Sequence, residues 1–410
     1  MNYSNPANLA LLACPGGEVF ADEVIVHLKK LYRRNYDKTV AELANRYEMN
    51  TETVMKQVNF VNDVASNPSC SQGNVLKYRS PRFKIPARFS LFPNGELKAE
   101  ILESIRGKDM YIIQDMENHY PLKFNDGKTL KELTINDHLM TTMVTVDAAK
   151  HAGAERITLV IPVYPYARQH KKKGREGLTA TRVGQIFESL GVNRIITLDV
   201  HSREIGNAFK FMRLENLHAS YQIIRKLSEI TDINRDDLVV LAPDTGAVDR
   251  NKFYANSLKK PLALLYKERD YSKVSQNALE NNIAEIRLLG NVKDKTVFMA
   301  DDMLGTGGTL LKAMKFLKEQ GARKVICAVS LPLFSGDAVT HFDAAYKEGL
   351  FYRIIGTNAV YHEDLLRREW YTSANITKLF AQTISRLYQG LSMSSLLDNR
   401  DIITKLLSEN

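Results

Sequence analysis

The chain has 410 residues, with 56 lysines and arginines against 47 aspartates and glutamates, a net charge of +9. Its hydrophobic content of 44% and charged content of 25% are those of an ordinary globular protein and exclude a chain that is disordered throughout. Its apolar runs fall short of the roughly 18–20 residues that a membrane-spanning helix needs, and its N-terminus does not resemble a signal peptide. The length predicts two or three domains.

The three cysteines, Cys14, Cys70 and Cys327, lie far apart in the sequence. Their odd number and wide spacing fit neither a disulfide framework nor a metal-binding motif. We therefore expect a protein of the reducing cytoplasm. The net charge suits nucleic acid, a membrane surface or a phosphorylated small molecule, and composition alone does not choose among them.

The N-terminal third contains a segment that interrupts the pattern of the rest. Within it, residues 39–60 are expected to form two short amphipathic helices around a polar turn, which is similar to a helix-turn-helix. This keeps open the hypothesis of a nucleic-acid-binding regulator that senses a phosphoribosyl ligand. Most helix pairs of this kind are packing elements, and this one lies inside a larger fold, which speaks against DNA binding.

From about residue 84, short apolar β-branched segments alternate with amphipathic helical segments. The expected strands are 110–114, 157–163, 195–200, 238–242, 262–266, 296–300, 325–331 and 354–360. Several are almost continuously hydrophobic, which is typical of a parallel sheet covered on both faces. The alternation predicts an α/β fold.

Two stretches, 150–162 and 318–332, share the order helix end, Gly-Ala, strand, which indicates two similar halves. The expected division is an N-terminal domain of residues 1–34 and 84–220, an inserted helical and polar segment at 35–83, a C-terminal domain of residues 221–375, and a C-terminal helix and tail at 376–410 that pack back on the N-terminal domain.

The sharpest motif is VFMADDMLGTGGTL at 297–310. An apolar strand leads through Asp301 and Asp302 into a small-residue loop and then into a helix. Glycines let backbone N–H groups approach a phosphate, and the N-terminus of a helix favours negative charge. Acids at the carboxyl end of a strand can accept hydrogen bonds from sugar hydroxyls or help to place a divalent cation. The pattern is neither the P-loop nor the dinucleotide-binding motif.

This loop resembles the phosphoribosyl-binding signature of type I phosphoribosyltransferases. Six further motifs stand in the order found in the ribose-phosphate pyrophosphokinase family: FPNGE at 92–96, ESIRG at 103–107, YPYARQ at 164–169, DVHS at 199–202, APDTG at 242–246 and KER at 267–269. The resemblance covers residues 8–32 and 84–398. It implies an α/β fold of two similar phosphoribosyltransferase-like domains, each a mainly parallel sheet flanked by helices.

The resemblance implies a kinase that transfers the β,γ-diphosphate of ATP to the 1-hydroxyl of ribose 5-phosphate. The products are AMP and phosphoribosyl pyrophosphate, for nucleotide biosynthesis, and Mg²⁺ is the cofactor. FPNGE serves a neighbouring subunit's site in the family, which implies a homo-oligomer based on dimers, with a hexamer as one option. Neither nucleic acid nor a membrane is then a partner. A catalytically weak regulatory homologue remains an alternative, beside the nucleic-acid-binding regulator.

The family's functional positions map onto residues of matching chemistry. The ATP-binding residues are Phe92, Asn94, Gly95, Glu96, Arg168 and Gln169. The ribose 5-phosphate residues are Arg269, Asp301, Asp302, Gly305, Thr306, Gly307, Gly308 and Thr309. The catalytic residues are Lys267 and Arg269. The metal-associated residues are His201 and Asp244, with Asp199 as an additional candidate.

The catalytic pair fits phosphoryl chemistry. Two cations two residues apart on an extended segment project to the same side and can neutralise the charge that builds on the leaving AMP. The polar stretch 270–282 that follows suits a lid that excludes water.

Three positions depart from the family pattern. Gly305 stands where the family usually has an acid, and His170 stands where it often has one. Arg203 replaces a small residue near the family's regulatory phosphate site. These changes bear on the ribose contacts, on the phosphate and metal contacts near residue 170, and on allosteric control.

Overall fold

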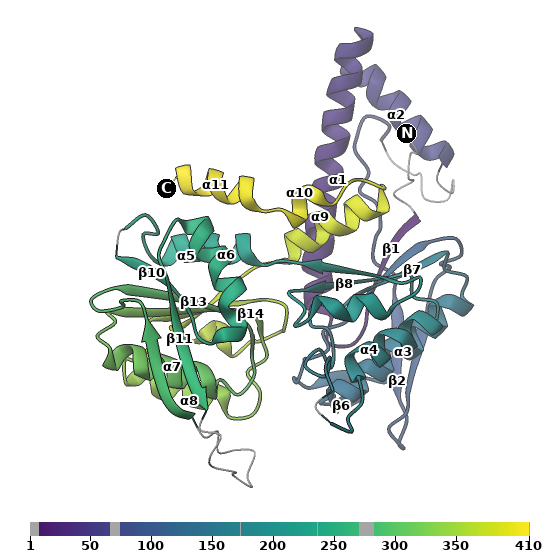
Figure 1. The fold of residues 1–410 in the computed structure, drawn as a ribbon. Coiled ribbons are helices and arrows are strands. Elements are labelled where there is room, and N and C mark those ends of the chain that lie inside the picture. Colours follow the sequence, from purple (N-terminus) through teal and green to yellow (C-terminus); the bar gives the residue numbers. More distant parts are fainter. Residues whose placement is uncertain (1–7, 66–73, 173, 236, 270–282, 410) are drawn as a thin grey trace. The chain divides into compact units, whose positions relative to one another are not determined.

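The computed structural model describes residues 8–65, 74–172, 174–235, 237–269 and 283–409. The chain divides into two compact units (Figure 1). Unit 1 consists of Met1–Leu217 and Thr377–Leu396, and unit 2 consists of His218–Ile376 and Leu397–Asn410. In the described ranges no helix is long and apolar enough to cross a membrane.

Unit 1 is built on a parallel sheet of five strands in the order β1-β4-β7-β8-β9. The strands are β1 (Leu9–Ala13), β4 (Asp109–Ile113), β7 (Arg156–Val160), β8 (Arg194–Leu198) and β9 (Arg213–Leu217). Strand β4 is buried along its whole length, as its apolar run predicts. Helices α3 (Ile135–His151) and α4 (Thr179–Ser189) lie in the crossovers, and Thr134 and Asp137 form a capping box that starts α3.

The inserted segment is a helix pair rather than two short helices. Helix α1 runs without a break from Glu18 to Tyr47, and α2 (Thr51–Ala65) follows a turn in which Glu48 adopts a left-handed conformation. Tyr36, Val40, Ala44 and Val54 form a small apolar cluster between the two helices. The predicted first short helix is therefore wrong, because it is the distal end of a 30-residue helix that starts inside unit 1.

Beyond the helix pair the chain returns to the edge of the sheet beside β1. The backbone N–H of Leu11 donates to Phe83 O at 2.7 Å, and the N–H of Ile85 donates to Leu11 O at 2.8 Å. Two antiparallel hairpins complete the unit. They are β2 (Ala87–Leu91) with β3 (Leu97–Ile101), and β5 (Leu122–Phe124) with β6 (Thr129–Lys131).

Unit 2 contains a seven-stranded sheet in the order β12-β11-β10-β13-β14-β15-β16, parallel except for β12 at one edge. Its strands are β10 (Leu238–Ala242), β11 (Leu262–Arg269), β12 (Ile283–Leu289), β13 (Thr296–Leu304), β14 (Lys324–Pro332), β15 (Arg353–Thr357) and β16 (Tyr371–Ala374). The α/β fold of two mainly parallel sheets flanked by helices is thus confirmed.

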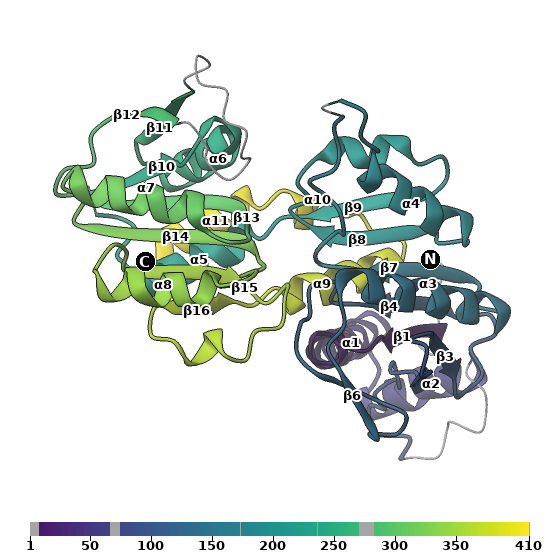
Figure 2. The same cartoon turned by 90° about the horizontal axis from the view of Figure 1, so that it is seen from below.

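Helices cover both faces of this sheet (Figures 1 and 2). On one face, α7 (Gly308–Glu319) and α8 (Ala338–Lys347) enclose a core that includes Met299, Phe342 and Trp370. On the other face lie α5 (Ser220–Ile230) and α6 (Val248–Leu258), where Tyr254 packs edge-to-face on Phe298 at 5.3 Å.

The C-terminal segment is shared between the units. Helix α9 (Thr377–Tyr388) packs on α1 in unit 1, where the rings of Phe20 and Phe380 meet edge-to-face at 5.2 Å. Helix α11 (Arg400–Glu409) packs on α5 and α6 in unit 2 and buries Ile403. This differs from the expectation that all of 376–410 packs on the N-terminal domain, because the apolar side of α11 is buried within unit 2.

The contact of α9 with α1 gives a stability prediction for unit 1. Because Phe380 is fully buried, Phe380→Ala should lower the free energy of unfolding by about 3–5 kcal/mol. Phe211→Ala, at a ring that is 87% exposed, should change it by less than about 0.5 kcal/mol. Urea unfolding measures the stability of both variants, and hydrogen exchange of the β1 and β4 amides shows whether the change lies in unit 1. Equal effects of the two substitutions would contradict this packing.

Candidate functional site

The strand order of unit 2 reverses between β10 and β13. The chain leaves β10 through α6 toward β11 and leaves β13 through α7 toward β14, on the opposite side. Loops that diverge in this way open a crevice beyond the carboxyl ends of the strands, where open α/β sheets bind ligands. Asp244 and the pair Asp301–Asp302 both lie at this edge.

The two acids of the pair lie next to each other in the second half of β13. The backbone N–H of Asp302 donates to Asp301 Oδ1 at 2.8 Å, and Arg250 Nη2 on α6 lies 4.0 Å from Asp302 Oδ2. Burial, and then the neighbouring Asp302 carboxylate, raises the pKa of Asp301 to about 7. Near neutral pH the pair therefore carries less than two full negative charges and offers both hydrogen-bond donors and acceptors to a hydroxyl.

The small-residue loop follows directly and ends at the N-terminus of α7. Gly307 precedes the helix with φ +75°, and Thr306, Gly308 and Thr309 are exposed. The first N–H groups of a helix have no partner within it, so they can bind an anion. A Cβ atom on Gly307 would lie 2.3 Å from Phe342 Cε2, whereas one on Gly308 would meet nothing within 4 Å. Gly305 accepts a backbone hydrogen bond from Ser335 at 3.1 Å.

Asp244 follows β10 and shapes the next turn. Its Oδ1 accepts a hydrogen bond from the backbone N–H of Ala247 at 2.9 Å. Lys267 and Arg269 occupy the carboxyl end of β11, paired with Ile286 and Ile283 of β12. The structure describes the backbone of this pair and not its side chains, and the proposed lid at 270–282 lies outside the described residues.

In unit 1, the ends of β7 and β8 bring two histidines together. The rings of His170 and His201 lie edge-to-face with their centres 5.0 Å apart, and His170 Nδ1 is buried and has no hydrogen-bond partner among the described residues. Asp199, at the start of the same loop as His201, has φ +39° and donates its backbone N–H to Leu217 O at 2.8 Å. Left-handed backbone at a non-glycine residue is common near functional sites.

The neighbouring Arg168 and Gln169 are exposed. Gln169 N–H donates to Tyr166 O at 2.8 Å, and this turn holds both side chains beyond the end of β7. Glu117 follows β4 on the same edge of the sheet. Burial raises the pKa of Glu117, and the positive charge of Arg168 opposes this rise.

FPNGE forms the turn of the β2–β3 hairpin. Phe92 N–H donates to Glu96 O at 2.9 Å, Asn94 Oδ1 accepts from Glu96 N–H at 3.2 Å, and Gly95 has φ +92°. Phe92 is 46% exposed. The hairpin therefore presents an aromatic ring and polar groups on the outside of unit 1.

Sequence reasoning missed several residues that build these edges. They are Gln114, Glu117, His138, Arg250 and Asn251. Gln114 Nε2 contacts His138 Nδ1 at 3.0 Å, and His138 Nε2 contacts Asn118 O at 2.7 Å. Burial lowers the pKa of His138, so its neutral ring serves as a bridge in the core. None belongs to a motif, and only tertiary packing reveals them.

The candidate ligand atoms differ in how well they suit Mg²⁺. Mg²⁺ prefers oxygen ligands, which Asp301 and Asp302 supply, whereas the imidazoles of His170 and His201 suit transition metals better. Within the described ranges, no group of three or more histidine, cysteine, aspartate or glutamate side chains is arranged to hold a metal. A hard cation at the acid pair would therefore need further oxygen ligands from a bound molecule.

The glycine loop gives a paired prediction. Gly307→Ala should lower the stability of unit 2 by about 2–5 kcal/mol, because it combines a left-handed backbone with a clash against Phe342. Gly308→Ala should leave stability within about 0.5 kcal/mol of the original chain. Thermal unfolding of the two variants, with hydrogen exchange of β13 and β14, tests this contrast. Similar losses in both would show that the loop does not have this conformation.

The acid pair predicts a pH dependence. Because the pKa of Asp301 is higher in the folded chain than in the unfolded chain, the folded state binds more protons between about pH 4 and 7. Unit 2 should therefore lose stability as the pH rises through this window. Asp301→Asn should remove that loss and gain at most about 4 kcal/mol relative to the original chain at pH 8. Unfolding curves that stay parallel from pH 4 to 8 would contradict the assignment.

Comparison with known proteins places this architecture in a family. A model of the N-terminal domain of ribose phosphate pyrophosphokinase matches residues 78–191, and a phosphoribosyl transferase domain model matches residues 212–360. The ribose-phosphate pyrophosphokinase of Nostoc sp. is 34% identical over 308 residues, which is 74% of this chain and 84% of that protein. Ribose-phosphate pyrophosphokinase A of Dictyostelium discoideum is 34% identical over 315 residues, 76% of this chain and 90% of that protein.

A solved structure agrees. The crystal structure of phosphoribosylpyrophosphate synthetase from Mycobacterium smegmatis aligns with a TM-score of 0.67 and 26% sequence identity, and the alignment covers 93% of this chain and 99% of that one. The resemblance that the ordered motifs indicated is confirmed. The chain belongs to the ribose-phosphate pyrophosphokinase family.

Proposed function

We propose that the chain is an active ribose-phosphate pyrophosphokinase, which transfers the β,γ-diphosphate of ATP to the 1-hydroxyl of ribose 5-phosphate and releases AMP. One observation carries the proposal: an acid pair and an anion-binding helix N-terminus lie together at the strand-order reversal of unit 2, in a chain of this family. A sugar phosphate needs both features, because its hydroxyls and its phosphate then find separate partners.

On the sugar side, the backbone N–H groups of Gly307, Gly308 and Thr309 bind the 5-phosphate, with hydroxyl donors from Thr306 and Thr309. Asp301 and Asp302 contact the ribose hydroxyls, and the partly protonated pair can accept from one hydroxyl and donate to another. Gly305 supplies only backbone atoms, so fewer side chains hold the ribose here than in a chain with an acid at that position.

On the nucleotide side, Arg168 pairs with phosphate oxygens through its planar guanidinium group, and Gln169 adds a polar contact. The exposed Phe92 stacks on adenine, while Asn94, Gly95 and Glu96 offer hydrogen bonds to the edge of the base. We assign the hairpin tip to the site of a neighbouring subunit, which requires a homo-oligomer based on dimers.

The catalytic step relies on Lys267 and Arg269. We assign both residues to this step because they are two residues apart at the carboxyl end of β11. Two cations there stabilise the negative charge that accumulates on the oxygen bridging to AMP as the bond breaks. Arg269 also pairs with the ribose 5-phosphate. The oxygen of the 1-hydroxyl bonds to the β-phosphorus as the bond from that phosphorus to the α,β-bridging oxygen breaks. AMP leaves with the bridging oxygen, and the hydroxyl proton passes to solvent.

We propose Mg²⁺ as the cofactor, with most of its ligands supplied by phosphate oxygens and water, as is usual for this ion. We assign metal-associated roles to His201 and Asp199 within unit 1 and, separately, to Asp244 and the acid pair within unit 2. When bound, the ion neutralises phosphate charge. Because His201 is a nitrogen donor, it would contact the ion weakly or orient one of its waters.

We place the enzyme in the cytoplasm, where the buried unpaired thiols of Cys14 and Cys327 stay reduced. No observation favours either alternative function. The α1–α2 pair, which motivated the DNA-binding hypothesis, is held together by its own apolar cluster and is continuous with unit 1.

The assignment of the catalytic pair is directly testable. Lys267→Ala should lower kcat for AMP release by about 100-fold or more, with little change in the thermal stability of the chain. Lys260→Ala is the matched control: Lys260 lies just before β11, where Nζ contacts the carbonyl oxygens of Asn234 and Arg235 at 3.0 and 2.8 Å. It should keep turnover within about twofold. If Lys267→Ala turns over at the original rate, the role of Lys267 is refuted.

A further inference from the structure

The side chain of Asn251 is fully buried on α6 and makes three hydrogen bonds. Its Nδ2 donates to Ala247 O at 2.9 Å and to Ala300 O at 2.8 Å, and its Oδ1 accepts from the backbone N–H of Ala300 at 2.9 Å. Two of these bonds engage the residue directly before Asp301. No motif includes Asn251, and it is too deeply buried to touch a substrate.

The side-chain amide of Asn251 takes the place of a strand neighbour that Ala300 lacks on its β10 side. Strands β10 and β13 pair from Leu238 and Thr296 up to Leu241 and Met299, and no further. Thr296 N–H donates toward β10, to Asp237 O at 2.9 Å. In a parallel sheet every second residue points its N–H and C=O to the same side, so Ala300 also faces β10.

The chain of β10 turns away after Ala242, at Pro243, so it does not extend the ladder to Ala300. A carboxamide carries both a donor and an acceptor, and it can therefore satisfy the N–H and the C=O of one residue at once. A buried backbone group without a partner would be costly. Asn251 thus fixes the last backbone position of β13 before the acid pair.

The same side chain also reaches the second loop of the crevice. Ala247, whose carbonyl oxygen accepts from Asn251, donates its N–H to Asp244 Oδ1. A continuous chain of hydrogen bonds therefore runs from Asp244 through Ala247 and Asn251 to Ala300, next to Asp301. Nη2 of the preceding residue, Arg250, lies 4.0 Å from Asp302 Oδ2, so α6 also places a positive charge beside the acid pair.

We propose that Asn251 is a positioning residue, which holds the strand end of Asp301 and Asp302 in register with the turn of Asp244 for binding of ribose 5-phosphate. This inference rests on the proposed function of the same site. Asn251 acts through the backbone of Ala300 and Ala247. Its removal loosens the sugar side of the site and leaves the nucleotide residues, which belong to unit 1, as they are.

The test variant is Asn251→Leu, which keeps the number of non-hydrogen atoms and the branch at Cγ and removes all three hydrogen bonds. We expect the KM for ribose 5-phosphate to rise by about tenfold or more, while the KM for ATP stays within about twofold. In the ligand-free protein, hydrogen exchange should accelerate at the amides of 300–304 and stay unchanged at 296–299.

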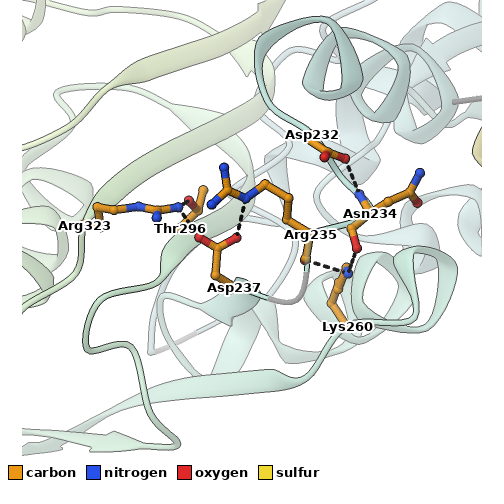
Figure 3. Close-up of polar contacts among 7 residues, drawn as sticks. All are labelled: Asp232, Asn234, Arg235, Asp237, Lys260, Thr296 and Arg323. Atoms are coloured by element: carbon orange, nitrogen blue, oxygen red, sulfur yellow. Dashed lines mark hydrogen bonds and ion pairs between the residues drawn. The ribbon is translucent and has the colours of Figure 1, made fainter.

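The matched control is Thr296→Val, at the other end of the same strand. Figure 3 shows Thr296 in a polar network with Arg323 and Asp237, where Thr296 Oγ1 accepts from Arg323 Nη2 at 3.0 Å. The exposed fraction of Thr296 is 3% and that of Asn251 is 0%, so the two residues are similarly buried. This variant should lower the melting temperature yet leave the KM for ribose 5-phosphate within about twofold.

The outcomes separate the two proposals. A wild-type chain that neither binds ribose 5-phosphate nor releases AMP would refute the proposed function, and the positioning role with it. An active wild-type chain whose Asn251→Leu variant keeps its KM for ribose 5-phosphate would refute the positioning role alone. If the leucine variant does not fold, Asn251→Ser is measured in the same way, and unchanged exchange at 300–304 in that variant overturns the inference.

Discussion

The reversal of strand order between β10 and β13 is the constraint on which the site of unit 2 depends. Parallel strands joined by right-handed crossovers place α6 on one face and α7 on the other, so the loops after β10 and β13 diverge. Asp244 lies on the loop after β10, whereas the acid pair lies within the second half of β13, ahead of the loop that leads into α7. Because the chain turns away from β10 at Pro243, Ala300 has a strand neighbour on the β14 side and none on the β10 side, where a buried side chain from α6 completes the ladder.

Two neighbouring carboxylates at this edge of the sheet repel each other, and the groups around them reduce the free-energy cost of that repulsion. The pKa of Asp301 rises because burial and the Asp302 carboxylate disfavour its charged form. Arg250 lies near Asp302, and backbone N–H groups donate to both acids. A site that tolerates partial protonation in the absence of ligand can contact sugar hydroxyls and still receive a cation together with phosphate groups.

Much of the fold was predictable from the sequence, because buried parallel strands are continuous apolar runs. All eight segments expected as strands overlap an observed strand, and β10 has the bounds that its apolar run predicted. Strands β9 and β16 are among those that were not predicted. Strand β9 has Glu215 and Asn216 in its middle and lacks an apolar run, and β16 has only four residues. The glycine loop was visible because it is local in sequence. The sequence did not reveal the roles of Asn251 and Glu117 or the contact between His170 and His201, because each depends on contacts between distant segments.

The central claim is that this chain moves a diphosphate group rather than a single phosphate. It is tested most directly by ³¹P NMR of the purified chain with ATP, Mg²⁺ and ribose 5-phosphate. We expect AMP and a 1-diphosphorylated ribose 5-phosphate to appear in equal amounts, while the β and γ resonances of ATP disappear together. Formation of ADP with a singly phosphorylated product, or loss of ATP that does not depend on ribose 5-phosphate, would contradict the account.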